Sequence, residues 1–141
     1  MFEAQIAHSY EAMNRKDLDA VMAAWAEGGV FEFPGRTPIS GRHEGKEAIR
    51  AFFGRIFDEL ESMHFTIRHV AMSNPVGLTL SNMVYVDWTV DEVTRDGRRF
   101  SHDGITVLKM KGGKAVWGRD YFFDLAGLEA MWPASVAGAA G

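Results

Sequence analysis

The chain contains no cysteine, which excludes disulfide bonds and thiolate chemistry and fits a cytoplasmic protein. It also lacks an apolar run of about 18 residues, the length that a membrane-spanning helix needs, so no membrane is expected. The first residues, Met1–Gln5, have neither the basic start nor the apolar run of a signal peptide. The net charge is −4 without any basic run, so nucleic acid is not an expected partner.

Apolar residues, in contrast, are abundant. Hydrophobic residues make up 47% of the 141 positions, and ten Phe, four Trp and eight Met are many for this length. They either fill a large core or line an apolar pocket. We expect one domain over residues 1–133 and a flexible tail over 134–141, because the last residues are small and show no pattern.

The first part of the chain shows helical spacing of apolar residues. We expect helices over 2–14, from Leu18 through Trp25, and over 46–60. Asp17 is placed to cap the second helix, and Gly28-Gly29 would end it. Residues 30–33 are expected to form a short strand, and residues 35–44 a polar loop.

After the third helix the period changes to two, which is typical of strands. The expected strands cover 64–72, 78–94, 99–110 and 114–124, and a short helix covers 125–131. Turn residues separate the strands at Asn74-Pro75, Arg95–Arg98 and Lys111–Lys114. Three helices followed by a meander predict an α+β domain. We expect the helices to pack in a curved, mixed or mostly antiparallel sheet whose cone shape encloses a pocket.

The last strand is aromatic but carries Asp120 in its middle. Because side chains alternate between faces, Asp120 shares a face with Gly118 and Phe122. If Phe122 points inward, Asp120 is a carboxylate in apolar surroundings, which is usually paired, neutralised or functional. The alternative is a structural hydrogen bond or an ion pair with an arginine.

Strand parity extends this prediction to the neighbouring strands. The inward set of residues 99–110 would be Phe100, His102, Gly104 and Thr106, and that of residues 78–94 would be Tyr85, Asp87, Thr89 and Asp91. Asp120, His102 and Asp87 would then lie near one level of the cone and could hold an acid and a base near neutral pH. His102 could also be a satisfied or exposed group, and Asp87 could face solvent or a dimer interface.

The opposite face of the long strand would expose Trp88 unless something covers it. Because exposed apolar sheet faces usually indicate association, we expect a homodimer through the outer face of the sheet. His102, Asp103 and Asp120 are possible metal ligands, but their spacing is not diagnostic, so neither a metal nor a cofactor is predicted. The sequence has no HExxH motif and no Ser–His elbow.

Five segments together resemble the SnoaL-like branch of the nuclear-transport-factor-2-like (NTF2-like) superfamily. They are Asn14–Val21, Gly45–Phe53, Asp96–Arg98, Gly112–Lys114 and Trp117–Asp124. The resemblance covers roughly residues 2–131, and the superfamily includes ketosteroid isomerases, limonene-type epoxide hydrolases, scytalone dehydratases and polyketide cyclases. It implies the cone fold, but the fold hosts many chemistries and also plain binding proteins.

Roles carry over only where residues match. Limonene-type epoxide hydrolases have an Asp at the position of Asp120, but Asp87 and Thr89 stand where they have an Arg and a second Asp. Phe31 and Phe33 stand where those enzymes hold water with Tyr and Asn.

In ketosteroid isomerases the proton-shuttling Asp falls at Phe33, the oxyanion-hole acid aligns with Asp120, and the oxyanion-hole Tyr falls nearest Ser9, one residue before Tyr10. The polyketide cyclases use an Asp–His pair, for which Asp120 and His102 are the candidates.

The resulting expectation is a cofactor-free acid–base enzyme acting on a small apolar cyclic or polyketide-like molecule. Asp120 would move a proton, His102 would orient it or stabilise an oxyanion, and Asp87 would tune His102. The expected pocket wall consists of Tyr10, Trp25, Phe31, Phe33, Phe53, Phe57, Tyr85, Thr89 and Phe122. Epoxide hydrolysis with altered polar residues and non-catalytic binding of a small molecule are the alternatives.

Overall fold

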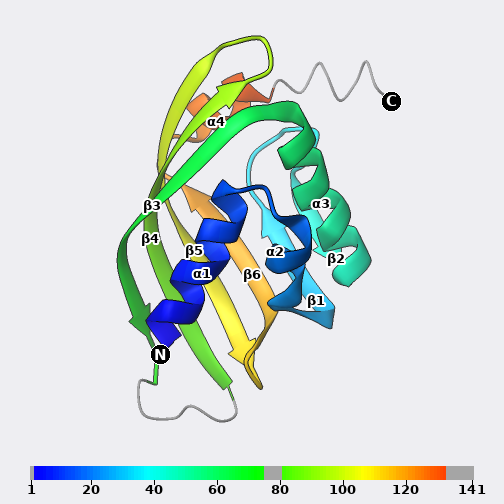
Figure 1. Ribbon diagram of the computed structural model, residues 1–141, viewed down its shortest axis with the longest axis vertical. Coiled ribbons are helices and arrows are strands. Elements are labelled where there is room, and N and C mark those ends of the chain that lie inside the picture. The colour runs from blue at the N-terminus through cyan, green and yellow to red at the C-terminus, as the bar shows by residue number, and fades with distance from the viewer. Residues whose placement is uncertain (1, 75–80, 133–141) are drawn as a thin grey trace.

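The computed structural model describes residues 2–74 and 81–132 (Figure 1). Its elements follow the predicted order, in which two helices and a strand precede the third helix, the long strands come next and a short helix is last. The helices are α1 (Phe2–Asn14), α2 (Leu18–Ala23), α3 (Lys46–Glu59) and α4 (Leu125–Met131). The strands are β1 (Trp25–Phe33), β2 (Gly41–Glu44), β3 (Leu60–Met72), β4 (Ser81–Thr94), β5 (Arg99–Lys111) and β6 (Lys114–Phe122). The predicted tail over 134–141, the turn at Pro75 and the strand start at 78–80 lie outside the described residues.

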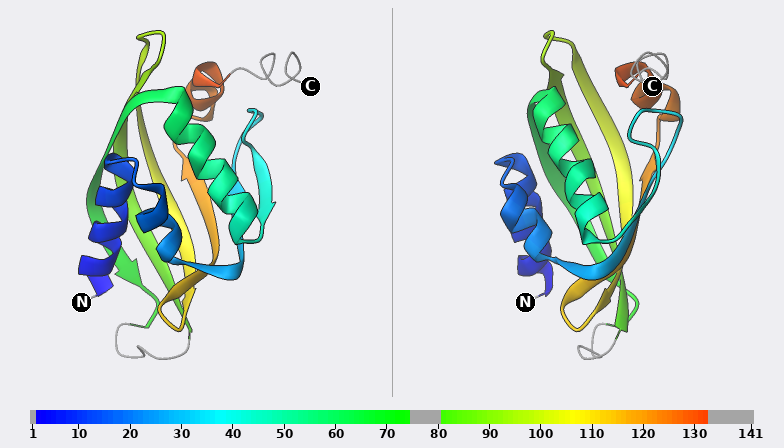
Figure 2. Two further views of the ribbon diagram at one scale, coloured as in Figure 1. Left: turned by 45° about the vertical axis from the view of Figure 1, so that its right-hand side comes forward. Right: turned by 90° about the vertical axis from the view of Figure 1, so that its right-hand side faces the viewer.

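The six strands form one sheet in the order β2-β1-β6-β5-β4-β3. Strand β1 runs parallel to β6, and the other neighbouring strands are antiparallel, so the predicted α+β class with a mixed sheet is confirmed. The sheet is curved, and α1, α2 and α3 lie on its inner face (Figures 1 and 2). Helix α1 packs on β3 and α3 packs on β1, which places the core between helices and sheet. Among the described residues, no helix is long and apolar enough to cross a membrane.

Helix α2 is shorter than predicted. Asp17 caps it as expected, accepting a 3.1 Å hydrogen bond from the Ala20 backbone N–H. The helix ends at Ala23, however, and Trp25 begins β1 instead of continuing the helical stripe. The Ala115 N–H donates to the Ala24 carbonyl at 2.8 Å, so this carbonyl pairs with the β6 side of the sheet and does not accept the hydrogen bond that a longer helix would give it. Helical periodicity over about two turns does not reveal such long-range pairing.

Two further boundaries differ from the prediction. Residues Gly41–Glu44 form β2, which pairs antiparallel with β1, instead of continuing the predicted polar loop. This edge strand is mostly exposed on both faces, so it lacks the alternation of apolar residues that marks a strand. Strand β3 begins at Leu60, directly after α3, because pairing with β4 starts there at Leu60 and Thr94.

The face of β4 is the main correction. Val84, Val86, Trp88 and Val90 are the buried inner set, and Trp88 is 1% exposed instead of lying on the outside. The predicted inward residues Tyr85, Asp87, Thr89 and Asp91 therefore lie on the outer face. The physical reason is burial: the even positions are apolar over most of the strand, and a shift by one residue would exchange the whole set. The inward set predicted for β5 and the inward placement of Asp120 and Phe122 on β6 are confirmed.

Candidate functional site

Asp120 lies on the inner face of β6, at the wall of an apolar cavity of about 80 Å³. The cavity lies between the first two helices and the sheet, and Tyr10, Trp25, Phe31 and Phe53 contribute to its wall. Polar groups are few there, so the Asp120 carboxyl is a single acidic group in mostly apolar surroundings. A cavity of this composition suits an apolar molecule that needs one proton donor or acceptor.

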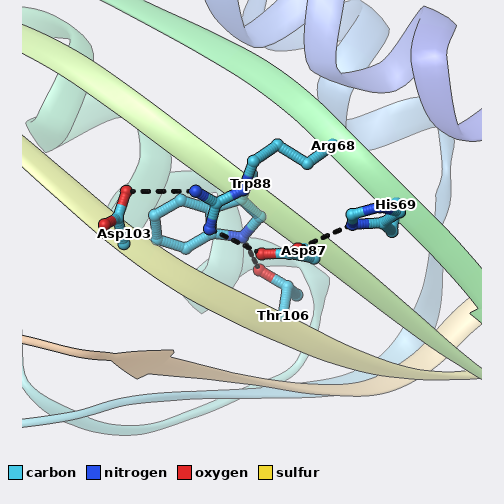
Figure 3. A network of polar contacts seen from close by, with 6 residues as sticks. All are labelled: Arg68, His69, Asp87, Trp88, Asp103 and Thr106. Carbon is cyan, nitrogen blue, oxygen red and sulfur yellow. Dashed lines mark hydrogen bonds and ion pairs between the residues drawn. The ribbon is translucent and has the colours of Figure 1, made fainter.

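A chain of two hydrogen bonds holds the carboxyl. The Trp88 indole Nε1–H donates to Thr106 Oγ1 at 2.8 Å, and the Thr106 hydroxyl donates to Asp120 Oδ1 at 2.5 Å. Figure 3 shows the first of these bonds, between side chains of β4 and β5. Because the indole can only donate, it fixes the direction of the Thr106 hydroxyl toward Asp120. The three strands thereby orient one carboxylate oxygen and leave the other oxygen for different partners.

Burial decides the protonation of this site. It raises the pKa of Asp120 to about 7, against the hydrogen bond from Thr106, which lowers it. Burial and the charge of Asp120 also raise the pKa of the Tyr10 hydroxyl, so this phenol stays protonated. Near neutral pH, Asp120 is therefore divided between the acid and the base form, while Tyr10 is a hydrogen-bond donor. Both properties suit proton transfer.

Replacing Thr106 with valine is expected to raise the pKa of Asp120, because the hydrogen bond that stabilises its charged form is lost. Any activity that needs the Asp120 carboxylate should then reach half of its maximum at a higher pH than in the wild type. Rate–pH profiles of the two proteins measure the shift. Thr106→Ser, which keeps the hydroxyl, is the matched control and should retain the wild-type profile; equal profiles for valine and wild type would contradict the prediction.

His102 is buried on the inner face of β5, as predicted, but its partner is not Asp120. Opposite Asp120 stands Thr106, and Phe122 stands opposite Gly104, so His102 lies two further positions along the strand. The ring centroids of Phe122 and His102 are 5.3 Å apart. The ionisable neighbour of His102 is Glu92, whose Oε1 lies 3.7 Å from His102 Nε2. Across the described residues, His102 and Asp120 form neither a hydrogen bond nor an ion pair.

Asp87 belongs to a polar network on the outer face, shown in Figure 3. Arg68 donates to Asp87 Oδ1 at 2.8 Å, and His69 Nδ1 lies 3.0 Å from Oδ2. The hydrogen bonds from His69 and Arg68 lower the pKa of Asp87. Asp103 is on the same face, 3.7 Å from the Arg68 guanidinium. Asp87 is therefore not placed to tune His102, and Asp103 does not join His102 and Asp120 in a ligand set.

Most of the residues predicted to form the pocket wall lie beside one of the two inner cavities. Tyr10, Trp25, Phe31 and Phe53 line the cavity described above, and Phe33, Phe53 and Phe122 line a smaller one beside it. Phe57 is buried in the core and lines neither. The prediction that Tyr85 and Thr89 line the pocket was wrong, because both side chains are on the outer face of β4.

Glu92 is the inner-face residue that the sequence analysis missed. It follows Val90 at the next even position of β4 and is 7% exposed. Burial, followed by the charge of Asp120, raises its pKa to about 8. The sequence did contain a signal for it, because Glu92 shares the strand face of four apolar residues: Val84, Val86, Trp88 and Val90. It was missed because the other face of the strand was predicted to point inward.

The sequence model described as the SnoaL-like domain matches residues 6–117. Bal32a, from a soil-derived mobile gene cassette, is 27% identical, with a TM-score of 0.80 over 92% of this chain and 95% of that one. An NTF2-like protein of unknown function from Burkholderia pseudomallei is 23% identical, with a TM-score of 0.79 over 94% and 97%.

A protein with a ketosteroid isomerase-like fold from Catenulispora acidiphila, crystallised with trimethylamine, is 18% identical. Its TM-score is 0.74 over 93% of this chain and 95% of that one, so it shows the same fold. No curated protein matches the sequence.

Proposed function

Because this chain belongs to the SnoaL-like family, whose fold serves isomerases and cyclases, we propose that it is a cofactor-free acid–base enzyme. Its substrate is a small apolar ring or polyketide-like compound, and Asp120 is the group that moves a proton. The reaction class is isomerisation, cyclisation or dehydration, each of which begins with removal of a proton from a carbon beside a carbonyl.

The observation that carries this proposal is the oriented carboxyl in an apolar cavity. A carboxylate whose pKa is about 7 is a stronger base than an ordinary aspartate and is still deprotonated in part at neutral pH. Thr106 fixes its orientation at 2.5 Å, and the protonated Tyr10 hydroxyl lines the same cavity. The Asp–His pair predicted from the sequence is replaced in this proposal by Asp120 with Thr106 and Tyr10.

Exchange of carbon-bound hydrogen tests the proposed function without knowledge of the natural substrate. 2-Tetralone is a bicyclic ketone with acidic hydrogens beside its carbonyl, and in D2O these hydrogens exchange through its enol. We expect the protein to accelerate the exchange above the rate in buffer alone, as followed by proton NMR. Binding of 2-tetralone without acceleration, repeated across a panel of enolisable ketones, would instead indicate a binding protein.

We also propose that a second copy of this chain covers the outer sheet face. Exposed apolar side chains gather there, with Phe123 89%, Tyr121 48% and Ile105 42% exposed. They flank a groove of about 360 Å³ that also contains Arg68 and Asp103. Because the face carries both charge signs, two copies related by a two-fold axis can pair opposite charges around an apolar centre.

Ile105→Glu is expected to shift a dimer toward monomer, because it places a charge at the centre of that apolar face. Sedimentation velocity of both proteins at equal concentration measures the change. Ala51→Glu, on the exposed side of α3, is the control and should leave the sedimentation coefficient unchanged. A monomeric wild type, or a dimer that tolerates Ile105→Glu, argues against this interface.

A further inference from the structure

A second cavity, of about 40 Å³, lies on the other side of Asp120, where α4 and the C-terminal half of α3 close the inner face. It shares Met13, Phe53, Phe65 and Asp120 with the larger cavity, so the two are direct neighbours. The rest of its wall is largely apolar, with Glu92 as its other acidic residue. A ligand whose apolar body occupies the larger cavity would pass Asp120 and point one end at Glu92.

Glu92 and His102 are buried polar side chains with unsatisfied hydrogen bonds. They are 7% and 4% exposed, and within the described residues Glu92 Oε1 and both ring nitrogens of His102 have no hydrogen-bond partner. The 3.7 Å between Oε1 and Nε2 is too long for a hydrogen bond. Because an unpaired buried polar group has lost its hydrogen bonds to water without replacing them, a ligand group that bonds to both side chains gains affinity.

The protonation states define which group fits. Burial and the charge of Asp120 raise the pKa of Glu92 to about 8, so its carboxyl is mostly protonated at neutral pH and can donate. Burial lowers the pKa of His102, against the nearby carboxylates of Asp124 and Asp103, so the imidazole is neutral and has one nitrogen that accepts. A hydroxyl group can accept from the carboxylic acid and donate to the accepting nitrogen of the imidazole, which gives each residue a hydrogen-bond partner.

We propose that Glu92 and His102 form a subsite for a hydroxyl group of the ligand, which is an apolar ring compound such as a phenol or a cyclic alcohol. The inference rests on the proposed function for the ligand's apolar body, which lies against Asp120. It narrows the substrate class to ring compounds that carry an oxygen at their inner end. Glu92 lines the cavity, and His102 Nε2 lies 3.7 Å from Glu92 Oε1, so in this proposal a hydroxyl group bound to that oxygen also donates to the imidazole beside it.

Two probes of nearly equal shape test the subsite: 2-naphthol and 2-methylnaphthalene, which differ by a hydroxyl and a methyl group. We expect the wild type to bind 2-naphthol at least about tenfold more tightly at neutral pH, as measured by titration calorimetry. Glu92→Leu should abolish this preference. Glu92→Gln, whose amide N–H still donates, should keep it, and this variant also covers the case in which the leucine variant does not fold.

Asp120→Asn separates the subsite from the proposed function. This variant should lose exchange of 2-tetralone but keep the preference for 2-naphthol, because Glu92 is unchanged. A wild type that binds both probes equally or neither, or a preference that survives Glu92→Leu, overturns the subsite. A wild type that prefers 2-naphthol but never accelerates exchange supports the subsite and contradicts the proposed function alone.

Discussion

Asp120→Asn is expected to lower the rate of 2-tetralone exchange at least about 100-fold, the usual contribution of a general acid or base. Asparagine keeps the side-chain oxygen that accepts from Thr106, so the hydrogen bonds to β5 and β4 are retained. It cannot take a proton from carbon. The measurement is exchange per mole of protein by NMR, at a pH above 7, where Asp120 is mostly charged.

The raised pKa of Asp120 also predicts how stability depends on pH, which gives a control that the variant is folded. The folded-state pKa of Asp120 is raised from 3.8 to about 7, so its contribution to stability is complete below about pH 4 and is lost as the pH rises through about 7. Asp120→Asn removes this loss, so at pH 8 the variant should melt no lower than the wild type. Glu92 adds a similar decline, which ends near pH 8 and remains in the variant. Exchange that survives in a folded Asp120→Asn protein rules out the assigned role.

Gly104→Ala is expected to lower the free energy of unfolding by about 3 kcal/mol, the upper end of the range for overpacking. A Cβ at this position would lie 2.5 Å from Cη2 of Trp88 and 2.5 Å from the Tyr121 backbone oxygen. Neither can yield easily. The Trp88 ring is buried against Phe65 and Phe122 at centroid distances of 5.1 and 5.2 Å, and the oxygen belongs to the neighbouring strand.

Gly28→Ala is the matched control, because a Cβ at this exposed position of β1 meets nothing within 4 Å. Its free energy of unfolding should stay within about 0.5 kcal/mol of the wild type. Urea titrations of the three proteins, followed by tryptophan fluorescence, give the comparison. Equal midpoints for the alanine variants would show that the Trp88 ring does not fill the space above Gly104.

Local patterns were sufficient for the positions of most elements. The helical spacing of Ile49, Phe52, Phe53, Ile56 and Phe57 predicted α3, and Lys111–Lys114 predicted the β5–β6 turn, since both signals lie within a few residues. The alternation in the last strand placed Asp120 inward, because Gly118 and Phe122 share its face. The resemblance in five segments identified the superfamily, which the match to residues 6–117 confirms.

The sequence by itself therefore determined the helices, the succession of long strands, the family and the inward position of Asp120, because each of these depends on patterns within single segments. The tertiary structure decided which face of β4 turns inward, and with it that Asp120 is held by Thr106 and Trp88 while His102 lies beside Glu92. The even positions of β4 are apolar from Val84 to Val90, but Asn82, Glu92 and Thr94 continue the same face with polar residues, so the alternation favours the even face over only part of the strand. That choice depends on packing against helices and strands distant in sequence, where burying Trp88 and the valines outweighs burying Asp87.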